Sequence, residues 1–223
     1  MPRLGVVVFP GTNCDHDTYY VAKELAGFDT SYIWHEETNL NKYHVIILSG
    51  GFSYGDYLRP GAIARFSPVM EAIREYVDKE KGIVIGICNG FQVLTEAGLL
   101  PGALTRNIGL KFLSMDVKLE ITNSNTSFTN LFERGEIITL PIAHMDGRFV
   151  IDKNSLSLLY KNNQIFLKYS GENPNGSMDH IAGIANMKLN VFGLMPHPER
   201  NAEKLMGSGD GIRFFKSLLE WLK

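Results

Sequence analysis

A cysteine between two glycines is the side chain in this sequence best suited to covalent chemistry. Residues 86–90 read Gly-Ile-Cys-Asn-Gly, after the apolar run 83–85 and before a helix-like stretch, 91–94. A strand-to-helix turn of this kind strains its central residue and needs small neighbours two positions away. Cys88 would lie at a helix N-terminus, which favours a thiolate and can hold an oxyanion. The pentapeptide predicts a nucleophile, but a buried structural cysteine fits it equally well.

A nucleophilic cysteine needs a base, and the base needs an orienting partner. Prolines on both sides of His197 exclude a helix, and in an extended segment residues two apart point the same way. Glu199 can therefore reach the imidazole of His197. The rival base is His144, because Asp146 lies close to it in the sequence. The other histidines lie in expected loops or at element ends, where solvation explains them.

A glycine-rich segment, residues 49–56, follows the apolar run 45–48. It lacks the Gly-Lys-Ser/Thr ending that a phosphate loop requires. Beside Cys88, the glycines Gly50 and Gly51 would bring a second backbone N–H to an oxyanion. From spacing alone, a flexible loop at a strand end explains them as well.

Composition places the chain among ordinary globular proteins and excludes several functions. Of its 223 residues, 44% are hydrophobic and 21% charged, and the formal net charge is -2, so nothing favours nucleic acid or an anionic membrane as partner. No apolar stretch approaches the length that crosses a bilayer. Two cysteines make a disulfide framework unexpected and favour a cytoplasmic setting, and no Cys or His spacing predicts a metal site.

Strand and helix signals alternate in the first half of the chain. We expect strands at residues 4–9, 31–34, 45–48 and 83–87, and helices at 15–26 and 69–81. This alternation predicts an α/β fold with a mostly parallel central sheet and helices on both faces. Sites in such sheets lie at the carboxyl ends of the strands. Cys88 and the segment 49–51 therefore belong at the same rim.

The second half is richer in strands. We expect them at residues 112–121, 137–140, 148–151, 164–169, 181–185 and 191–195, with a closing amphipathic helix at about 210–222. The polar loops between these elements are too short to link domains. We therefore expect one domain over residues 1–223.

Three motifs together resemble the class I (triad) glutamine amidotransferases, in which the order is also Cys, His, Glu. They are the elbow at residues 86–92, the Ser-Gly-Gly at 49–51 and the His-Pro-Glu at 197–199. Residues 9–15, 50–62 and 193–200 resemble one branch, the glutaminase subunits of phosphoribosylformylglycinamidine synthase from purine synthesis. The resemblance covers essentially the whole chain and implies a flavodoxin-like fold.

The resemblance implies roles for these residues. Cys88 attacks the side-chain amide of glutamine, His197 protonates the departing ammonia and then activates water, and Glu199 orients His197. Backbone N–H groups near Gly51, with Gly50 beside it, and near Asn89 hold the oxyanion.

Gln92 is expected to help hold the substrate. The chain departs from the family pattern at Gly109, where a serine is usual, and at Asp146, where a glutamate is usual. Both changes concern binding more than chemistry, so we expect activity.

The resemblance also implies partners. A large synthetase subunit binds ATP, with Mg, and formylglycinamide ribonucleotide, and a small bridging subunit is often needed. This chain itself is expected to hold no cofactor. Its glutaminase is expected to stay nearly silent until the synthetase binds, as in the multi-subunit form of the enzyme.

Three alternatives remain. A glutaminase serving another synthetase, such as one for histidine or pyridoxal phosphate, lacks the long loop of residues 52–62. A cysteine hydrolase or chaperone of similar fold has its histidine soon after the cysteine, whereas here none follows Cys88 before His144. A non-catalytic regulatory subunit that binds glutamine needs neither Cys88 nor His197.

Overall fold

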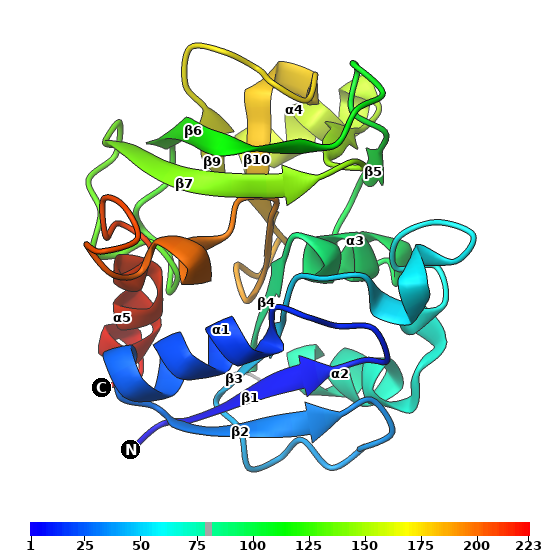
Figure 1. Ribbon diagram of the computed structural model, residues 1–223, viewed down its shortest axis with the longest axis vertical. Helices are drawn as coiled ribbons and strands as arrows, with labels where there is room; N and C mark the ends of the chain where they lie inside the picture. Colours follow the sequence, from blue (N-terminus) through cyan, green and yellow to red (C-terminus); the bar gives the residue numbers. More distant parts are fainter. Residues whose placement is uncertain (79–81) are drawn as a thin grey trace.

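The computed structural model describes residues 1–78 and 82–223 and is an α/β protein (Figure 1). Its strands are β1 (Arg3–Val8), β2 (Asp29–Trp34), β3 (Val45–Leu48), β4 (Ile83–Ile87), β5 (Ala103–Thr105), β6 (Leu113–Ile121), β7 (Ile137–His144), β8 (Arg148–Val150), β9 (Ile165–Tyr169), β10 (Ile181–Ala185) and β11 (Val191–Leu194). Its α-helices are α1 (Asp15–Tyr20), α2 (Pro68–Asp78), α3 (Asn89–Glu96), α4 (Lys153–Lys161) and α5 (Ile212–Trp221). Short π or 3-10 turns are η1 (Val21–Ala26), η2 (Ser53–Asp56), η3 (Ala64–Phe66), η4 (Met178–His180) and η5 (Pro198–Asn201).

Within those two ranges, nine strands form one sheet in the order β2-β1-β3-β4-β11-β10-β9-β6-β7. The strands from β2 to β11 are parallel to their neighbours, and those from β11 to β7 pair antiparallel. Strands β5 and β8 form a separate antiparallel pair. The predicted mostly parallel sheet is confirmed in the half that carries Cys88. The strand-rich second half extends the same sheet.

The sequence of each strand matches its place in the sheet. Every residue of β3, β4 and β11 is buried, as expected of short apolar strands covered on both faces. The edge strand β7 alternates buried and more exposed residues, so only one face packs on the core. Helix α5 packs against η1, which continues α1, on one side of the sheet, and α2 and α3 lie on the other, as predicted (Figure 1).

The helices differ in detail from the expectations. The predicted helix 15–26 is α-helical only as far as Tyr20 and continues as the π-helical turn η1, which Gly27 ends with a φ of 88°. Helix α2 begins at Pro68, and the predicted end of that helix lies in residues 79–81, outside the described residues. Helix α4 was not expected, although the Asp152 carboxylate caps it by accepting two backbone N–H groups.

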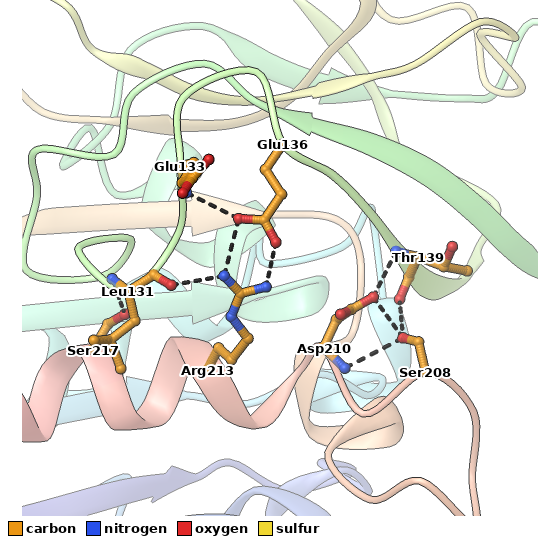
Figure 2. A network of polar contacts seen from close by, with 8 residues as sticks. All are labelled: Leu131, Glu133, Glu136, Thr139, Ser208, Asp210, Arg213 and Ser217. Carbon is orange, nitrogen blue, oxygen red and sulfur yellow. Dashed lines mark hydrogen bonds and ion pairs between the residues drawn. The ribbon is translucent and has the colours of Figure 1, made fainter.

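Figure 2 shows polar contacts that join α5 and the segment before it to β7 and the loop before that strand. The Asp210 carboxylate, just before α5, accepts the Thr139 N–H at 3.0 Å, and Arg213 of α5 forms an ion pair with Glu136. Asn201, at the end of η5, donates its side-chain amide to the Thr139 carbonyl at 2.7 Å. The segment after β11 is therefore fixed between β7 and α5. In the part of the chain that the structure describes, no helix is long and apolar enough to cross a membrane.

Candidate active site

Cys88 occupies the strained turn that its flanking glycines predict. It joins β4 to α3 with φ 50° and ψ -102°, a conformation that few residues other than glycine adopt. A Cβ at Gly90 would lie 2.0 Å from the Leu48 carbonyl oxygen, and one at Gly86 would lie 2.6 Å from the backbone of Gly90. Neither position can carry a side chain without moving the backbone. The predicted elbow is confirmed.

The thiol of Cys88 faces the end of the antiparallel half of the sheet. The backbone N–H of Cys88 donates to the Leu194 carbonyl at 2.7 Å, which fixes the elbow against β11. Its Sγ lies 3.8 Å from the Ala143 carbonyl oxygen of β7. The sulfur therefore sits where the carboxyl ends of β4 and β11 meet the last residues of β7.

His197 and Glu199 form the pair that their spacing predicts. The Glu199 carboxylate accepts the Nδ1–H of His197 at 2.6 Å, with side-chain exposures of 0% and 2%. The Nε2 atom is also buried and has no hydrogen-bond partner among the described residues. Burial lowers the pKa of His197, but the Glu199 carboxylate and the thiols of Cys88 and Cys14 outweigh it and raise that pKa well above its ordinary value. The pair can therefore hold a proton taken from Cys88.

The two glycines after β3 make room for this pair. A Cβ at Gly50 would lie 2.6 Å from Cε1 of His197, so any side chain there would displace the imidazole. Gly51 has a φ of 134°, and a Cβ there would lie 2.6 Å from the Asn13 nitrogen. Gly51 and Cys88 line the same cavity, so the structure brings the predicted glycine loop to the thiol.

That cavity, of about 370 Å³, is large enough for an amino acid. Its walls come from the loop after β3, the elbow and the turn after β7. Among its lining residues are Cys88, Gln92, Asp56, Asp146, Arg106 and His144.

Asn89 and Gln92 connect these walls by a chain of hydrogen bonds. Asn89 accepts the Ser53 N–H at 3.0 Å and donates to Gln92 Oε1 at 2.9 Å and to Asp56 Oδ1 at 3.2 Å. Gln92 in turn donates to the Asp146 carbonyl at 2.7 Å. The amide of Gln92 is thus engaged within the protein, and its first effect on the cavity is to set the shape of the wall.

Asp56 was not singled out as a site residue by the sequence analysis. Burial, and then the nearby Asp146 carboxylate, raise the pKa of Asp56 to about 6, against a lowering by its hydrogen bond to Asn89. Arg106 Nε lies 3.9 Å from the Asp146 carboxylate. The cavity is therefore lined by two carboxylates and by the guanidiniums of Arg106 and Arg59, a charge pattern that suits the α-amino and α-carboxyl groups of an amino acid.

His144, the rival base, is hydrogen-bonded to the side-chain amide of Asn107, whereas the sequence suggested Asp146 as its partner. The side-chain nitrogen of Asn107 donates to the carbonyls of Lys111 and His144, so its Oδ1 must be the acceptor of the His144 Nδ1–H at 3.1 Å. Burial, and then the charge of His197, lower the pKa of His144 to about 4. His144 is therefore neutral near pH 7, whereas His197 is built to carry a proton. This contrast favours His197 as the base.

Cys14 was also missed, because nothing local in the sequence links it to His197. Its sulfur, a ring nitrogen of His197 and a carboxylate oxygen of Glu199 all lie within 4.8 Å of one another. Cysteine, histidine and glutamate are all residue types that bind metal ions, but their spacing in the sequence did not predict that these three would lie together. However, Arg200 Nη2 lies 3.0 Å from that sulfur, and its positive charge opposes a cation there.

Residues 1–222 match a family model described as a CobB/CobQ-like glutamine amidotransferase domain. The subunit PurQ of phosphoribosylformylglycinamidine synthase from Trichormus variabilis is 54% identical over 218 residues, which cover 98% of this chain and 97% of that relative. PurQ from Alkaliphilus metalliredigens is 54% identical over 221 residues, 99% of this chain and 97% of the relative. This chain belongs to the PurQ branch of the glutamine amidotransferases. A solved PurLQS structure from Thermotoga maritima matches it with a TM-score of 0.91 and 47% identity, over 100% of this chain and 99% of that one. The resemblance to the PurQ branch is confirmed.

Proposed function

We propose that this chain is the glutaminase subunit of phosphoribosylformylglycinamidine synthase. It hydrolyses glutamine to glutamate and ammonia and passes the ammonia to a synthetase subunit. That subunit uses ATP to convert formylglycinamide ribonucleotide to formylglycinamidine ribonucleotide in purine biosynthesis. The observation that carries the proposal is the buried pair His197 and Glu199, which follows β11, the strand that pairs with β4 beside the Cys88 elbow.

The chemistry follows from the positions of these groups. His197 takes the thiol proton, and the Cys88 sulfur attacks the side-chain carbonyl carbon of glutamine. The tetrahedral intermediate collapses as His197 returns the proton to the leaving nitrogen, which releases ammonia and leaves a glutamyl thioester. His197 then removes a proton from water, the hydroxide attacks the thioester, and glutamate leaves as the thiol recovers its proton. Glu199 keeps Nδ1 of His197 protonated throughout, so that Nε2 exchanges the proton.

Backbone N–H groups provide the oxyanion site. We assign it to the N–H groups of Asn89, at the start of α3, and of Gly51, which lines the cavity beside Cys88. The N-terminal end of α3 adds a partial positive charge at the same place. Gly50 contributes by leaving space for the His197 ring.

The charges at the far end of the cavity orient the substrate. The α-ammonium group of glutamine pairs with Asp56 and Asp146, and its α-carboxylate pairs with Arg106. Gln92 supports this end through its bond to the Asp146 carbonyl. Arg59, which also lines the cavity, is held by Glu96 through two hydrogen bonds of 2.6 and 2.7 Å, so we give the substrate contact to Arg106.

The partners supply what this chain does not. We propose that residues 1–223 act as one glutaminase domain in the cytoplasm and hold no cofactor. ATP, Mg and formylglycinamide ribonucleotide bind the large synthetase subunit, with a small bridging subunit between the two. Because free ammonia is wasted without an acceptor, glutamine hydrolysis depends on the partner.

The test is glutamate release from glutamine, with the synthetase subunits, ATP and formylglycinamide ribonucleotide each present or omitted. We expect full release only in the complete mixture, and none with Cys88→Ala. The Cys88→Ala complex should still make product from added ammonia, which shows that the synthetase is active, and the variant should co-elute with the synthetase subunits, which shows that it folds and assembles. Glutamine binding without release in the complete mixture would instead support a regulatory subunit.

A further inference from the structure

A second buried thiol lies against the catalytic pair, and the proposed mechanism does not use it. Cys14 lies between β1 and α1, is 2% exposed and is a free cysteine. Its Sγ accepts a hydrogen bond from Arg200 Nη2 at 3.0 Å and lies 3.4 Å from Asn13 Oδ1. Arg200 is itself paired with Asp17 of α1 at 3.4 Å. Polar groups on both sides therefore fix the position of this sulfur.

The Cys14 sulfur lies close to the imidazole ring of His197. A Cβ built on Gly50 would lie 2.6 Å from Cε1 of the ring and 3.2 Å from the Cys14 sulfur, so both groups border the space that Gly50 leaves open. The sulfur, a ring nitrogen and a Glu199 oxygen lie within 4.8 Å of one another. Both cysteines also line one small cavity of about 80 Å³, together with His197 and Arg200.

We propose that Cys14 is a positioning residue, whose sulfur orients the His197 ring and stabilises it in the protonated state, and that Arg200 fixes this sulfur. This inference rests on the proposed function, because it assigns Cys14 a task only if His197 is the base. A polarisable sulfur beside the ring stabilises the positive charge that His197 gains when it takes the Cys88 proton.

The charges around His197 agree with this role. The ionisable groups that face it or its neighbours are Glu199, Cys88, Cys14, His144, Arg200 and Asp17. Cys14 is among the groups that raise the pKa of His197, after burial, which lowers it, and Glu199 and Cys88, which raise it. Without the sulfur, the ion pair between the Cys88 thiolate and the His197 imidazolium is less populated.

Two substitutions separate this role from simple packing. Cys14→Val removes the polar atom and is larger than the thiol, whereas Cys14→Ser is smaller and keeps an acceptor for Arg200. A role in packing alone lets both variants lower stability, one by overpacking and one by leaving space, and leaves thiolate formation at Cys88 unchanged. A role in orienting His197 and stabilising its charge makes valine lower the reactivity of Cys88 more than serine does.

The experiment measures alkylation of Cys88 by iodoacetamide against pH, in the assembled complex, with each cysteine followed separately by mass spectrometry. In Cys14→Val we expect the rate near pH 7 to fall about threefold or more, and to return to the native value at alkaline pH, where the thiol ionises without help. Cys14→Ser should lie between Cys14→Val and the native protein.

A native alkylation profile in Cys14→Val, with a native thermal unfolding midpoint, would overturn the inference. His197→Gln separates this failure from that of the proposed function. If His197→Gln also leaves the profile unchanged, His197 is not paired with Cys88 and the triad itself is wrong. If only His197→Gln changes it, the triad stands and Cys14 has no part in it.

Discussion

The side-chain amide of Asn89 donates to the Asp56 carboxylate across 3.2 Å and thereby joins the nucleophile elbow to the loop after β3. Asn89 directly follows Cys88 and also accepts the Ser53 N–H at 3.0 Å. The cavity wall that we propose binds glutamine and the turn that presents the Cys88 thiol are therefore one hydrogen-bonded unit. Changes on either side should affect both substrate binding and the reactivity of Cys88.

Glutamine binding should weaken as the pH falls through about 6. The pKa of Asp56 is raised to about 6, so below that pH its carboxyl group is neutral and no longer attracts the α-ammonium group. We expect KM for glutamine to rise over this range, with a smaller change in kcat.

In Asp56→Asn, KM should be raised by about tenfold or more at pH 7.5 and should lose its dependence on pH near 6. Steady-state glutamate release by the complete complex measures both parameters. An unchanged KM in Asp56→Asn would remove Asp56 from the ammonium site.

Glycine at position 90 should be essential for the elbow. The alanine methyl of Gly90→Ala would lie 2.0 Å from the Leu48 carbonyl oxygen, so helix α3 or strand β3 must move. We expect a loss of about 1–3 kcal/mol or more in the free energy of unfolding, together with loss of glutaminase activity.

Gly109→Ala is the matched control, because its new Cβ has nothing within 4 Å and its φ is not positive. It should change stability by less than about 0.5 kcal/mol. Urea unfolding of both variants measures the difference, and equal stabilities would contradict the clash at position 90.

Substitutions at the three triad positions should not all reduce glutamine-dependent activity to the same extent. Cys88→Ala and His197→Ala should abolish glutamine-dependent synthesis, whereas Glu199→Gln should lower kcat by about 10²-fold or more, because it orients the base without reacting itself. His144→Gln should keep measurable turnover, since neutral His144 does not carry the proton. Synthesis from added ammonia serves as the control for all four. If His144→Gln were as damaging as Cys88→Ala and His197→Ala were harmless, the base would be His144.

The contacts in Figure 2 should contribute to stability more than to chemistry. Asp210→Ala leaves the Thr139 N–H and the Ser208 hydroxyl without their acceptor, at a cost of about 1–2 kcal/mol. Asp116→Ala, at an exposed position of β6, should cost much less. Thermal unfolding and glutaminase activity, measured side by side, test this. A loss of activity at a temperature where Asp210→Ala is fully folded would mean that these contacts also affect the triad.

Local sequence patterns predicted the catalytic geometry because that geometry is local. Two glycines flank Cys88, and an extended run between prolines sets His197 beside Glu199, so spacing alone predicted the turn at Cys88 and the contact between His197 and Glu199. Spacing alone left open whether Cys88 is a nucleophile and whether His144 is the base. The buried parallel strands could be read from their apolar runs for the same reason.

Contacts that depend on strand order could not be read in this way. Cys14 and Arg200 are 186 positions apart, and they meet only because the sheet places β11 close to β1, with two strands, β3 and β4, between them. The partnership of His144 with Asn107 and the approach of Asp56 to Asp146 are equally non-local. Helix α4 was missed although Asp152 signals its start, because its apolar face is short.

The insertion of β11 between β4 and β10 has a consequence for the newly made protein. During synthesis, Cys88 leaves the ribosome long before β11 and the base that follows it. Strand β4 can pair with β3 at once, but its other neighbour, β11, is made about a hundred residues later, and such distant pairing is slow. A growing chain therefore carries the Cys88 thiol before His197, its proposed base, has been made, and we expect no ammonia release until β11 has joined the sheet.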